Sequence, residues 1–461
     1  MSNKPNRTTF RERMDTMVAG LRDEIVGGIL SVGSFLPSEV ELGKRYQLSK
    51  NSVRKGLDML VAEKLIEKVP CVGTRVCAPA VQGGVTIRLG CYSGVMEQTG
   101  LNRILSEFHV AFPHIRVQTV ALPFVNYHES IMDCLHNGML DAFTVNQNDF
   151  CHFAENDNLD WLEPIDPPSG LYPFLHRAFV SEKRQYAVPF VFSPVVLCYN
   201  RDHFAAKNMR EPDSSWTWSD FLTAAAQLSE GSGRFGFYFY LLSLNRWPVF
   251  LLQSGAKFRA ERDGAVRIAG TKLQEALALC RELIDSGSFL SLFAEGTNDA
   301  ELLFSQEKVS MIMTTYFSLN YIQNKGFAFD ISPLPYFEQP ASLLSAIGLG
   351  INRKSEHKEA VRTLIDYLLD YPAQLSVRQN SHSIPSLIQA AEWSGQGSVK
   401  HPSRYHMYRE IIPTFKYVTD LHITPAELDM MNSELKMYWS KLEREDDVCR
   451  RLETLMSPVT Q

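Results

Sequence analysis

Hydrophobic residues near the start of the chain recur at steps of three and four, which is the period of a helix with one buried face. The first such run predicts a helix from about Phe10 to Leu30, and its end is loosened by Gly27 and Gly28. The positions expected to be buried are Met14, Met17, Leu21, Ile25 and Ile29. A turn at residues 31–33 is expected to follow this helix.

Two shorter helices are predicted next, with a tight turn between them. Pro37 stops the preceding segment, and Ser38 can cap a helix together with Glu41 three residues later, as in a capping box. Ser49 is expected to cap the second helix, whose buried stripe is Val53, Leu57, Leu60 and Val61. Two short hydrophobic runs, 65–69 and 74–77, then predict a β-hairpin whose tip holds Pro70 and Cys71.

From Val85 the pattern changes to strands alternating with helices. Strands are expected at 85–90, 115–120 and 140–145, with helices at 100–111 and 128–137 between them. This alternation predicts a parallel sheet covered by helices, and ligands on such sheets bind at the carboxyl ends of the strands. Tyr92, Ser93 and residues 146–149 follow two of these strand ends. A last long helix is predicted after Thr424, with its stripe formed by Leu428, Met431, Leu435, Tyr438 and Leu442.

Length and charge divide the chain further. With 461 residues it exceeds one compact core, so two or three domains are expected. Residues 1–78 hold 13 Lys and Arg against 9 Asp and Glu, a net charge of +4. Because the whole chain has a net charge of −6, residues 79–461 carry −10. A small basic module on a large acidic one suits a nucleic-acid-binding head. We therefore expect domains at 1–78 and 85–461, with residues 79–84, rich in Pro and Gly, as a linker.

Several classes of protein are disfavoured by composition. No apolar run is long enough to span a bilayer, and no apolar signal segment follows Met1, so a cytoplasmic location is expected. The eight cysteines contain no CxxC pair, and they are expected to be structural thiols; we expect no metal and no cofactor. No Gly-x-Ser-x-Gly, HExxH or phosphate loop is present, so we do not expect an enzyme.

The N-terminal pattern resembles the winged-helix domain of GntR-type transcription regulators over about seventy residues. The matching positions are Leu21, Glu24, Ile25, Gly28, Gly33, residues 36–39, Leu42, Tyr46, residues 48–50, Val53, Arg54, Leu60, Leu65, Ile66, Gly73 and Thr74. The resemblance implies binding to double-stranded operator DNA, with the start of the second short helix in the major groove. The expected DNA-binding residues are Ser38, Lys50, Asn51, Ser52, Arg54, Lys55, Thr74 and Arg75. Lys50 stands where Arg is commoner, which keeps the charge but loses the bidentate fork, and Pro70 with Cys71 is unusual for the wing tip.

The remainder, about 85–455, resembles family-1 extracellular solute-binding proteins. The similarity is carried by residues 186–204 (Tyr-Ala-Val-Pro to Tyr-Asn-Arg-Asp-His-Phe) and, in order, by residues 216–221, 247–255, 304–313, 346–360 and 385–386. The resemblance implies a two-lobed α/β fold of the periplasmic-binding type, so the expected fold class is an α+β winged helix-turn-helix followed by that fold. The expected ligand-binding residues are Tyr92, Ser93, Asn148, Asp149, Phe190, Ser193, Trp247, Thr315 and Tyr316. Trp216 and Trp218 are expected to pack at a helix start, and Trp247 suits core packing as well as a ligand contact.

Together the two resemblances predict a ligand-responsive transcription regulator that binds its operator as a homodimer and senses a sugar or oligosaccharide. An enzyme that acts on its ligand under control of the same head is the alternative. An uptake receptor is a weaker third reading, since it would need no operator-reading head.

Overall fold

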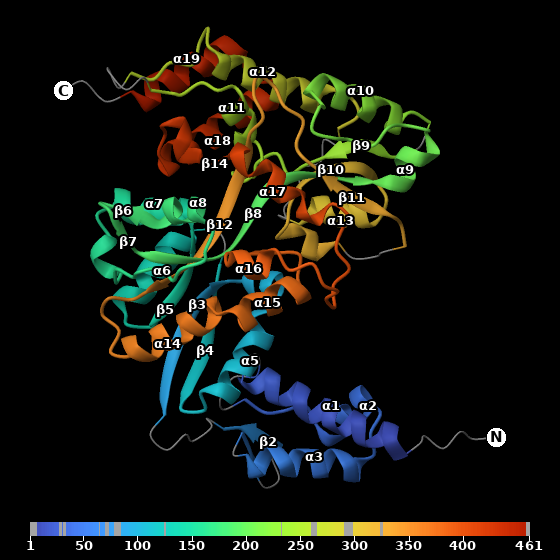
Figure 1. Ribbon diagram of the computed structural model, residues 1–461, viewed down its shortest axis with the longest axis vertical. Helices are drawn as coiled ribbons and strands as arrows, with labels where there is room; N and C mark the ends of the chain where they lie inside the picture. Colours follow the sequence, from blue (N-terminus) through green and yellow to red (C-terminus); the bar gives the residue numbers. More distant parts are fainter. Residues whose placement is uncertain are drawn as a thin grey trace. The chain divides into compact units, whose positions relative to one another are not determined.

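The computed structural model describes residues 7–26, 30, 34–63, 65–69, 73–77, 84–123, 126–231, 233–259, 265–289, 298–322 and 326–457 (Figure 1). The chain divides into two compact units. The first unit comprises Met1–Met96, Gly100–Thr144 and Ile351–Leu368, and the second comprises Glu97–Thr99, Val145–Gly350 and Leu369–Gln461. The expected glycine pair 27–28, the turn 31–33, the wing tip 70–71 and linker residues 79–83 lie outside the described residues.

The head, as we name residues 7–77, consists of three helices and a hairpin. Its elements are α1 (Arg7–Val26), α2 (Glu39–Tyr46), α3 (Lys50–Ala62), β1 (Ile66–Val69) and β2 (Gly73–Val76). The strands pair antiparallel, from Ile66 opposite Val76 to Val69 opposite Gly73. Residues before α2 join the hairpin, because the Leu36 amide donates to the Thr74 carbonyl at 2.8 Å. The winged helix-turn-helix expected from the sequence is confirmed.

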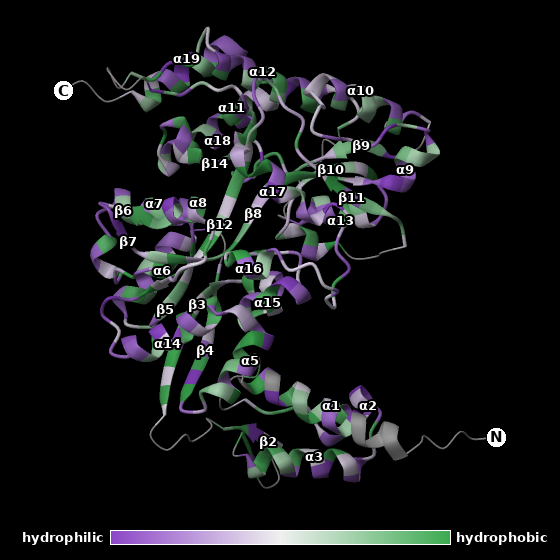
Figure 2. Ribbon diagram, viewed as in Figure 1, coloured by the Kyte–Doolittle hydropathy of each residue, from purple (hydrophilic) through white to green (hydrophobic). Residues whose placement is uncertain are grey.

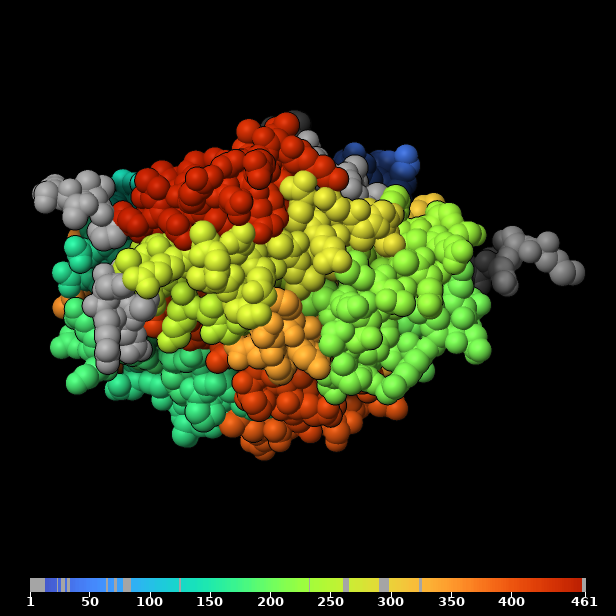
Figure 3. Space-filling view, turned by 90° about the horizontal axis from the view of Figure 1, so that it is seen from above, coloured from blue at the N-terminus to red at the C-terminus, as the bar shows by residue number. Residues whose placement is uncertain are grey.

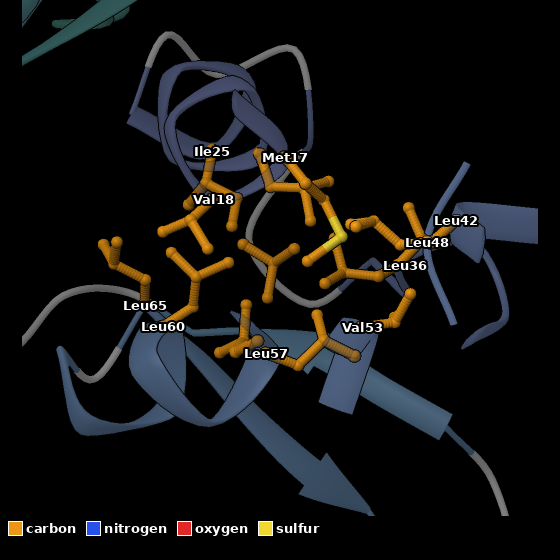
Figure 4. Close-up of a cluster of buried hydrophobic side chains, with 13 residues drawn as sticks. Met17, Val18, Ile25, Leu36, Leu42, Leu48, Val53, Leu57, Leu60 and Leu65 are labelled. Carbon is orange, nitrogen blue, oxygen red and sulfur yellow. The ribbon is translucent and has the colours of Figure 1, made fainter. Parts of the chain in front are cut away.

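The head has a hydrophobic core of its own, drawn from its three helices, its hairpin and the adjoining residues Leu36, Leu48 and Leu65 (Figure 4). The fully or nearly buried members are Met17, Val18, Leu21, Ile25, Leu36, Leu42, Leu48, Val53, Leu57, Leu60, Leu65, Ile66 and Val76. The helical stripes expected on α1 and α3 therefore meet in this core, with Val61 packed partly buried against it. Burial of a side chain of this size stabilises by about 1.5–3 kcal/mol, which is what holds so small a domain together.

The rest of the first unit is a parallel α/β layer. Its strands are β3 (Val85–Tyr92), β4 (Ile115–Leu122) and β5 (Ala142–Asn146). Strand β3 pairs parallel with β4 along its whole length and with β5 at Leu89 and Gly90. The connecting helices are α5 (Leu101–Ala111) and α6 (Tyr127–His136), and α14 (Lys358–Leu369) returns to this unit from late in the chain. The predicted alternation and its parallel pairing are confirmed.

The second unit is built on one long strand, β8 (Ala187–Asn200), in which every residue is buried. Strands β12 (Ser342–Ile351), β10 (Val309–Thr315), β11 (Phe329–Ser332) and β13 (Ile384–Pro385) all pair antiparallel with it. The edges are extended in parallel by β9 (Phe235–Tyr238) on β10 and β14 (Phe415–Lys416) on β12. In Figure 2 strands β8 and β12 are coloured mainly toward the hydrophobic end of the scale, as expected for strands covered on both faces.

Shorter elements complete the second unit. They are α7 (Gln147–Glu155), α8 (Pro173–His176), β6 (Val180–Ser181), β7 (Arg184–Gln185), α9 (Arg201–Ala206), α10 (Trp218–Ser229), α11 (Pro248–Gln253), α12 (Lys272–Asp285), α13 (Asp299–Ser305), α15 (Tyr371–Asn380), α16 (Ile388–Ala391), α17 (Tyr408–Ile411), α18 (Pro425–Trp439) and α19 (Glu445–Met456). As expected, Trp218 packs at the start of a helix, where Thr217 and Asp220 form a capping box.

The C-terminal helices show one confirmed prediction and one correction. Thr424 caps α18 with Glu427 in a capping box, as expected. Leu442, however, does not continue the buried stripe: it is 72% exposed, because α18 ends at Trp439 and Lys441 takes a left-handed conformation with φ 63°. A further helix, α19, follows and packs beside α12, as the red and yellow segments of Figure 3 show. Among the described residues, no helix is long and apolar enough to cross a membrane.

Candidate functional site

The two helices of the head are fixed by caps at the turn between them. The Ser38 side chain accepts from the Glu41 amide at 3.3 Å, and the Glu41 carboxylate accepts from the Ser38 amide at 2.8 Å. The hydrogen bonds that the Ser38 amide and then the Ser38 hydroxyl donate to the Glu41 carboxylate lower the pKa of Glu41. Gln47 ends α2 in a left-handed conformation, and Ser49 caps α3 by accepting from the Ser52 amide. The start of α3 is therefore held in one orientation by hydrogen bonds at both sides of the turn.

An exposed basic and polar face lies on the first two turns of α3. Lys50, Asn51, Arg54 and Lys55 are all exposed, as a DNA-contacting face requires. Ser52 differs from the expectation: it is only 6% exposed, and its hydroxyl lies 2.8 Å from that of Ser49. Ser52 therefore belongs to the helix cap and is not part of the exposed face.

Glu39, which was not among the expected DNA-binding residues, organises this face. Arg54 Nε lies 3.0 Å from both carboxylate oxygens of Glu39, and Lys50 Nζ lies 3.9 Å from one of them. The hydrogen bond to Glu39 raises the pKa of Arg54, which stays charged. The capping pattern at 38–41 was a usable signal for this residue, because it places position 39 in the first turn of α2, beside α3.

The hairpin carries the two remaining candidates for DNA contact. Arg75 is exposed, and its Nε donates to Glu67 on the opposite strand at 2.7 Å. Thr74 is half-buried, and its carbonyl is taken by the Leu36 amide. Thr74 therefore contributes its backbone to the fold, and the exposed Arg75 side chain would have to leave Glu67 to reach a phosphate.

In the first unit, the expected ligand residues Tyr92 and Ser93 end β3 in different environments. Tyr92 is buried and stacks on Tyr127, with ring centroids 3.6 Å apart and planes 19° apart. The Tyr127 hydroxyl in turn donates to the Thr144 carbonyl at 2.9 Å. Ser93 is exposed. Of this pair, Ser93 is the one that a solute could reach directly in this conformation.

The segment after β5, where ligand contacts were expected, is the start of a helix. Asn146 caps α7, accepting from the Asp149 amide at 2.8 Å. Asn148 and Asp149 lie in the first turn of α7 and are half-buried. A helix N-terminus favours hydrogen-bond acceptors, so part of the polar character here serves the helix itself.

The other expected ligand residues are buried within the second unit: Phe190, Ser193, Trp247, Thr315 and Tyr316. Several already have internal partners. The Trp247 indole donates to the Asn432 side chain at 3.1 Å, and the Tyr316 hydroxyl donates to the Tyr405 carbonyl at 2.8 Å. In this conformation these side chains pack the core, and their contact with a ligand stays a prediction.

A pocket of about 340 Å³ opens on the second unit and contains none of the predicted ligand residues. It is lined by Thr217, Trp218, Ser219, Leu222, Leu279, Glu282, Tyr336 and Phe337. Its volume lies at the lower end of small-molecule sites. No group of three or more His, Cys, Asp or Glu side chains that could hold a metal ion occurs among the residues that the structure describes.

Comparison with family models assigns both parts of the chain. Residues 14–76 match the model described as bacterial regulatory proteins, gntR family. Residues 105–401, more than half of the chain, match the model described as bacterial extracellular solute-binding protein. A Brucella abortus (strain 2308) protein named as a binding protein is 21% identical over 216 residues, which are 45% of this chain and 52% of that protein. The chain thus spans about half the length of the curated relatives it matches.

Solved structures of sugar-binding proteins have the same fold as the larger part of the chain. An ABC substrate-binding protein from Listeria monocytogenes in complex with cycloalternan aligns with a TM-score of 0.69 and 22% identity, over 81% of this chain and 98% of its own. Maltose-bound MalE3 of T. maritima gives 0.70 and 18%, over 81% and 99%. A solute-binding protein of Thermotoga lettingae bound with α-D-tagatose gives 0.70 and 17%, over 82% and 100%. This likeness confirms the two-lobed α/β fold that was expected from the sequence.

Proposed function

Because the chain belongs to the bacterial extracellular solute-binding protein family and carries a GntR-family domain at residues 14–76, we propose that it is a ligand-responsive transcription regulator. One observation carries the proposal: a winged helix with an exposed basic face on α3 is joined in one chain to a binding-protein fold. A protein that reads operator DNA works where that DNA is, so the cytoplasm is the proposed location.

The proposed effector is a sugar or oligosaccharide. Support comes from the solved structures of the same fold, whose bound molecules are cycloalternan, maltose and tagatose. Sugars present apolar C–H faces and hydroxyl groups, which aromatic and amide side chains can bind together. Asn148 and Asp149, half-buried in the first turn of α7, provide polar groups of this kind, and Tyr92 would have to leave its stack on Tyr127 to offer its ring. The head is proposed to bind DNA as a homodimer, because winged and helix-turn-helix proteins commonly read two half-sites.

Binding of effector and operator should be coupled through one free energy. If effector binding changes operator affinity by some factor, operator binding must change effector affinity by the same factor, typically 5- to 150-fold. Titrating the effector with and without operator DNA, and the operator with and without effector, gives two factors that must agree. Coupling factors of one in both directions would leave a DNA-binding protein and a solute-binding protein that merely share a chain.

The ligand itself can be found by a thermal-shift screen. At about a hundred times its dissociation constant, a cognate effector should stabilise the protein by about 2.7 kcal/mol. The screen covers sugars, oligosaccharides and non-sugar solutes such as peptides and polyamines. If a peptide or a polyamine raises the melting temperature and no sugar does, the proposed effector class is wrong.

We further propose that the protein does not transform its effector. Long incubation followed by chromatography of the small molecule should return it unchanged, at a protein concentration that binds most of it. Release of a product would instead favour the alternative, an enzyme regulated by the same head.

Glu39 provides a test of how the DNA-reading face is organised. Glu39→Gln removes a negative charge and weakens the hold on Arg54 and Lys50, so affinity for non-specific DNA should rise a few-fold at low salt. Because Arg54 then loses its fixed geometry, the ratio of operator affinity to non-specific affinity should fall. Fluorescence anisotropy with operator and scrambled duplexes measures both. Glu67→Gln, which frees Arg75 on the hairpin, is the matched control, and the specificity ratio should fall less in it.

A further inference from the structure

A buried arginine without a counter-charge lies in the second unit. Arg378, on α15, is 3% exposed. Among the residues that the structure describes, no carboxylate pairs with it. Removal of a charged side chain from water is strongly unfavourable even after relaxation, and buried charges are normally paired. Arg378 therefore differs from Arg246, a second buried arginine among the described residues, which is attracted by the buried carboxylate of Glu301.

Two histidines occupy the positions where an acid would normally stand. Arg378 Nη1 contacts His401 Nε2, and Nη2 lies 3.3 Å from His406 Nε2. His401 Nε2 also lies 3.2 Å from the Arg378 carbonyl, and its Nδ1 lies 3.2 Å from His382 Nδ1. Arginine can only donate, so His406 Nε2 accepts and the proton of the neutral ring sits on Nδ1. Burial, then the charges of Arg409 and Arg378, lower the pKa of His406 to about 4, so the ring is neutral near pH 7.

Two hydrogen-bond donors of this group are left unused. Arg378 Nε and His406 Nδ1 are buried, and neither has a partner among the described residues. An unsatisfied buried donor destabilises the fold, and more so when it is charged. The group thus combines one positive charge with two N–H donors, and lacks both an anion and an acceptor.

Aromatic rings offset only part of this cost. The Arg378 guanidinium carbon lies 4.0 Å from the centroid of the Tyr405 ring and 6.0 Å from that of Trp393. A cation–π contact stabilises a buried cation by less than the burial of an unpaired charge destabilises it. His401, His406 and Trp393 are only partly buried, so the edge of the cluster is in reach of solutes.

We propose that the Arg378 cluster (Arg378, Trp393, His401, Tyr405 and His406) binds the oxyanion of a small molecule, a phosphate or a carboxylate. The planar guanidinium and the unused N–H donors match the acceptor oxygens of such a group. The anion supplies the missing counter-charge, and the aromatic rings lie against the rest of the molecule to which the oxyanion belongs. The proposal does not depend on the effector being a sugar, because an anion-binding cluster in the second unit would be present in either case.

The test uses the full chain and measures its melting temperature in sodium phosphate, sodium sulfate or sodium acetate against sodium chloride at equal ionic strength. Phosphate or acetate should raise the melting temperature by several degrees at about a hundred times the dissociation constant. Response to phosphate and sulfate alone assigns a phosphate-type ligand, and response to acetate assigns a carboxylate. No rise with any oxyanion beyond that in chloride overturns the proposal.

Variants locate the binding site. Arg378→Gln should abolish the rise, and Arg210→Gln should keep it, since Arg210 is an exposed arginine paired with Asp213 on the same unit. Arg54→Gln should also keep it; loss of the rise in that variant would place the anion on the head and overturn the proposal. If Arg378→Gln does not fold, the test uses His406→Phe, which removes the unused Nδ1–H. This variant should weaken the affinity for phosphate or acetate at least tenfold. An unchanged affinity in His406→Phe would contradict the proposal.

Discussion

Replacing Arg54 with alanine is expected to weaken operator binding by about ten- to a hundredfold, which corresponds to roughly 1–3 kcal/mol. Arg54 is exposed on the second turn of α3, where the N-terminal part of a recognition helix meets the groove. Its guanidinium is held by Glu39, and a preoriented fork loses little conformational freedom when it binds a base edge or phosphate. Titrations by fluorescence anisotropy at several salt concentrations measure both the affinity and its salt dependence.

The salt dependence tells which kind of contact Arg54 makes. Loss of one phosphate contact should reduce the slope of log affinity against log salt by about one and weaken all sequences alike. Loss of a base contact should instead relax the preference at one operator position. Arg22→Ala is the control, because it removes an exposed arginine, paired with Glu63, from α1 of the same domain. Operator affinity unchanged in Arg54→Ala and equal to that of the control would show that α3 is not the recognition helix.

The head could be predicted well because its signals are local. Ser38 with Glu41, and Ser49 before a buried stripe, define helix starts through atoms only three residues apart, and the structure contains both caps. Ser52 was misplaced for a related reason. A serine three residues after a capping serine can turn back to the cap. The hydroxyl of Ser52 lies 2.8 Å from that of Ser49, and the Ser52 side chain is buried as a result. Residue type alone does not distinguish a hydroxyl offered to DNA from one that closes a helix.

The binding residues of the larger part could not be predicted in the same way, because their environment depends on distant segments. Trp247 is paired with Asn432, and Tyr316 with Tyr405, across 185 and 89 residues. An aromatic residue with a polar atom suits a sugar site and a buried core equally well until its partner is known. The Arg378 cluster could not be predicted for the same reason. Its histidines follow Arg378 by 23 and 28 residues and form no spaced motif.

Leu442 illustrates a limit of periodicity itself. The hydrophobic repeat continues at the right spacing past Trp439, but the backbone leaves the helix there, and the left-handed Lys441 turns the chain toward α19. A period predicts which face a residue occupies only while the helix lasts. Without a glycine or proline at that point, nothing in the local pattern marks the end.

Leu57→Ala is expected to unfold the head and abolish operator binding while the larger part of the chain stays folded. Leu57 is buried in the core of the head, and large-to-small changes at such sites cost about 2–5 kcal/mol. A single core in a domain of about seventy residues rarely supplies more than about 3–5 kcal/mol, so most of the stability of the head would be lost. The buried members of this core all lie between Met17 and Val76, within the head, so the loss should stay within it.

Calorimetry of the full chain measures this as the disappearance of one unfolding transition, with the stabilisation by effector of the remaining transition unchanged. Met59→Ala on the same helix is the matched control: Met59 is 42% exposed, so it should change stability by less than about 0.5 kcal/mol and leave operator binding intact. If Leu57→Ala also removed the response to effector, the two parts would fold as one cooperative unit. The head would then depend on the solute-binding fold for its stability, and coupling of effector to operator could arise through folding of the head itself.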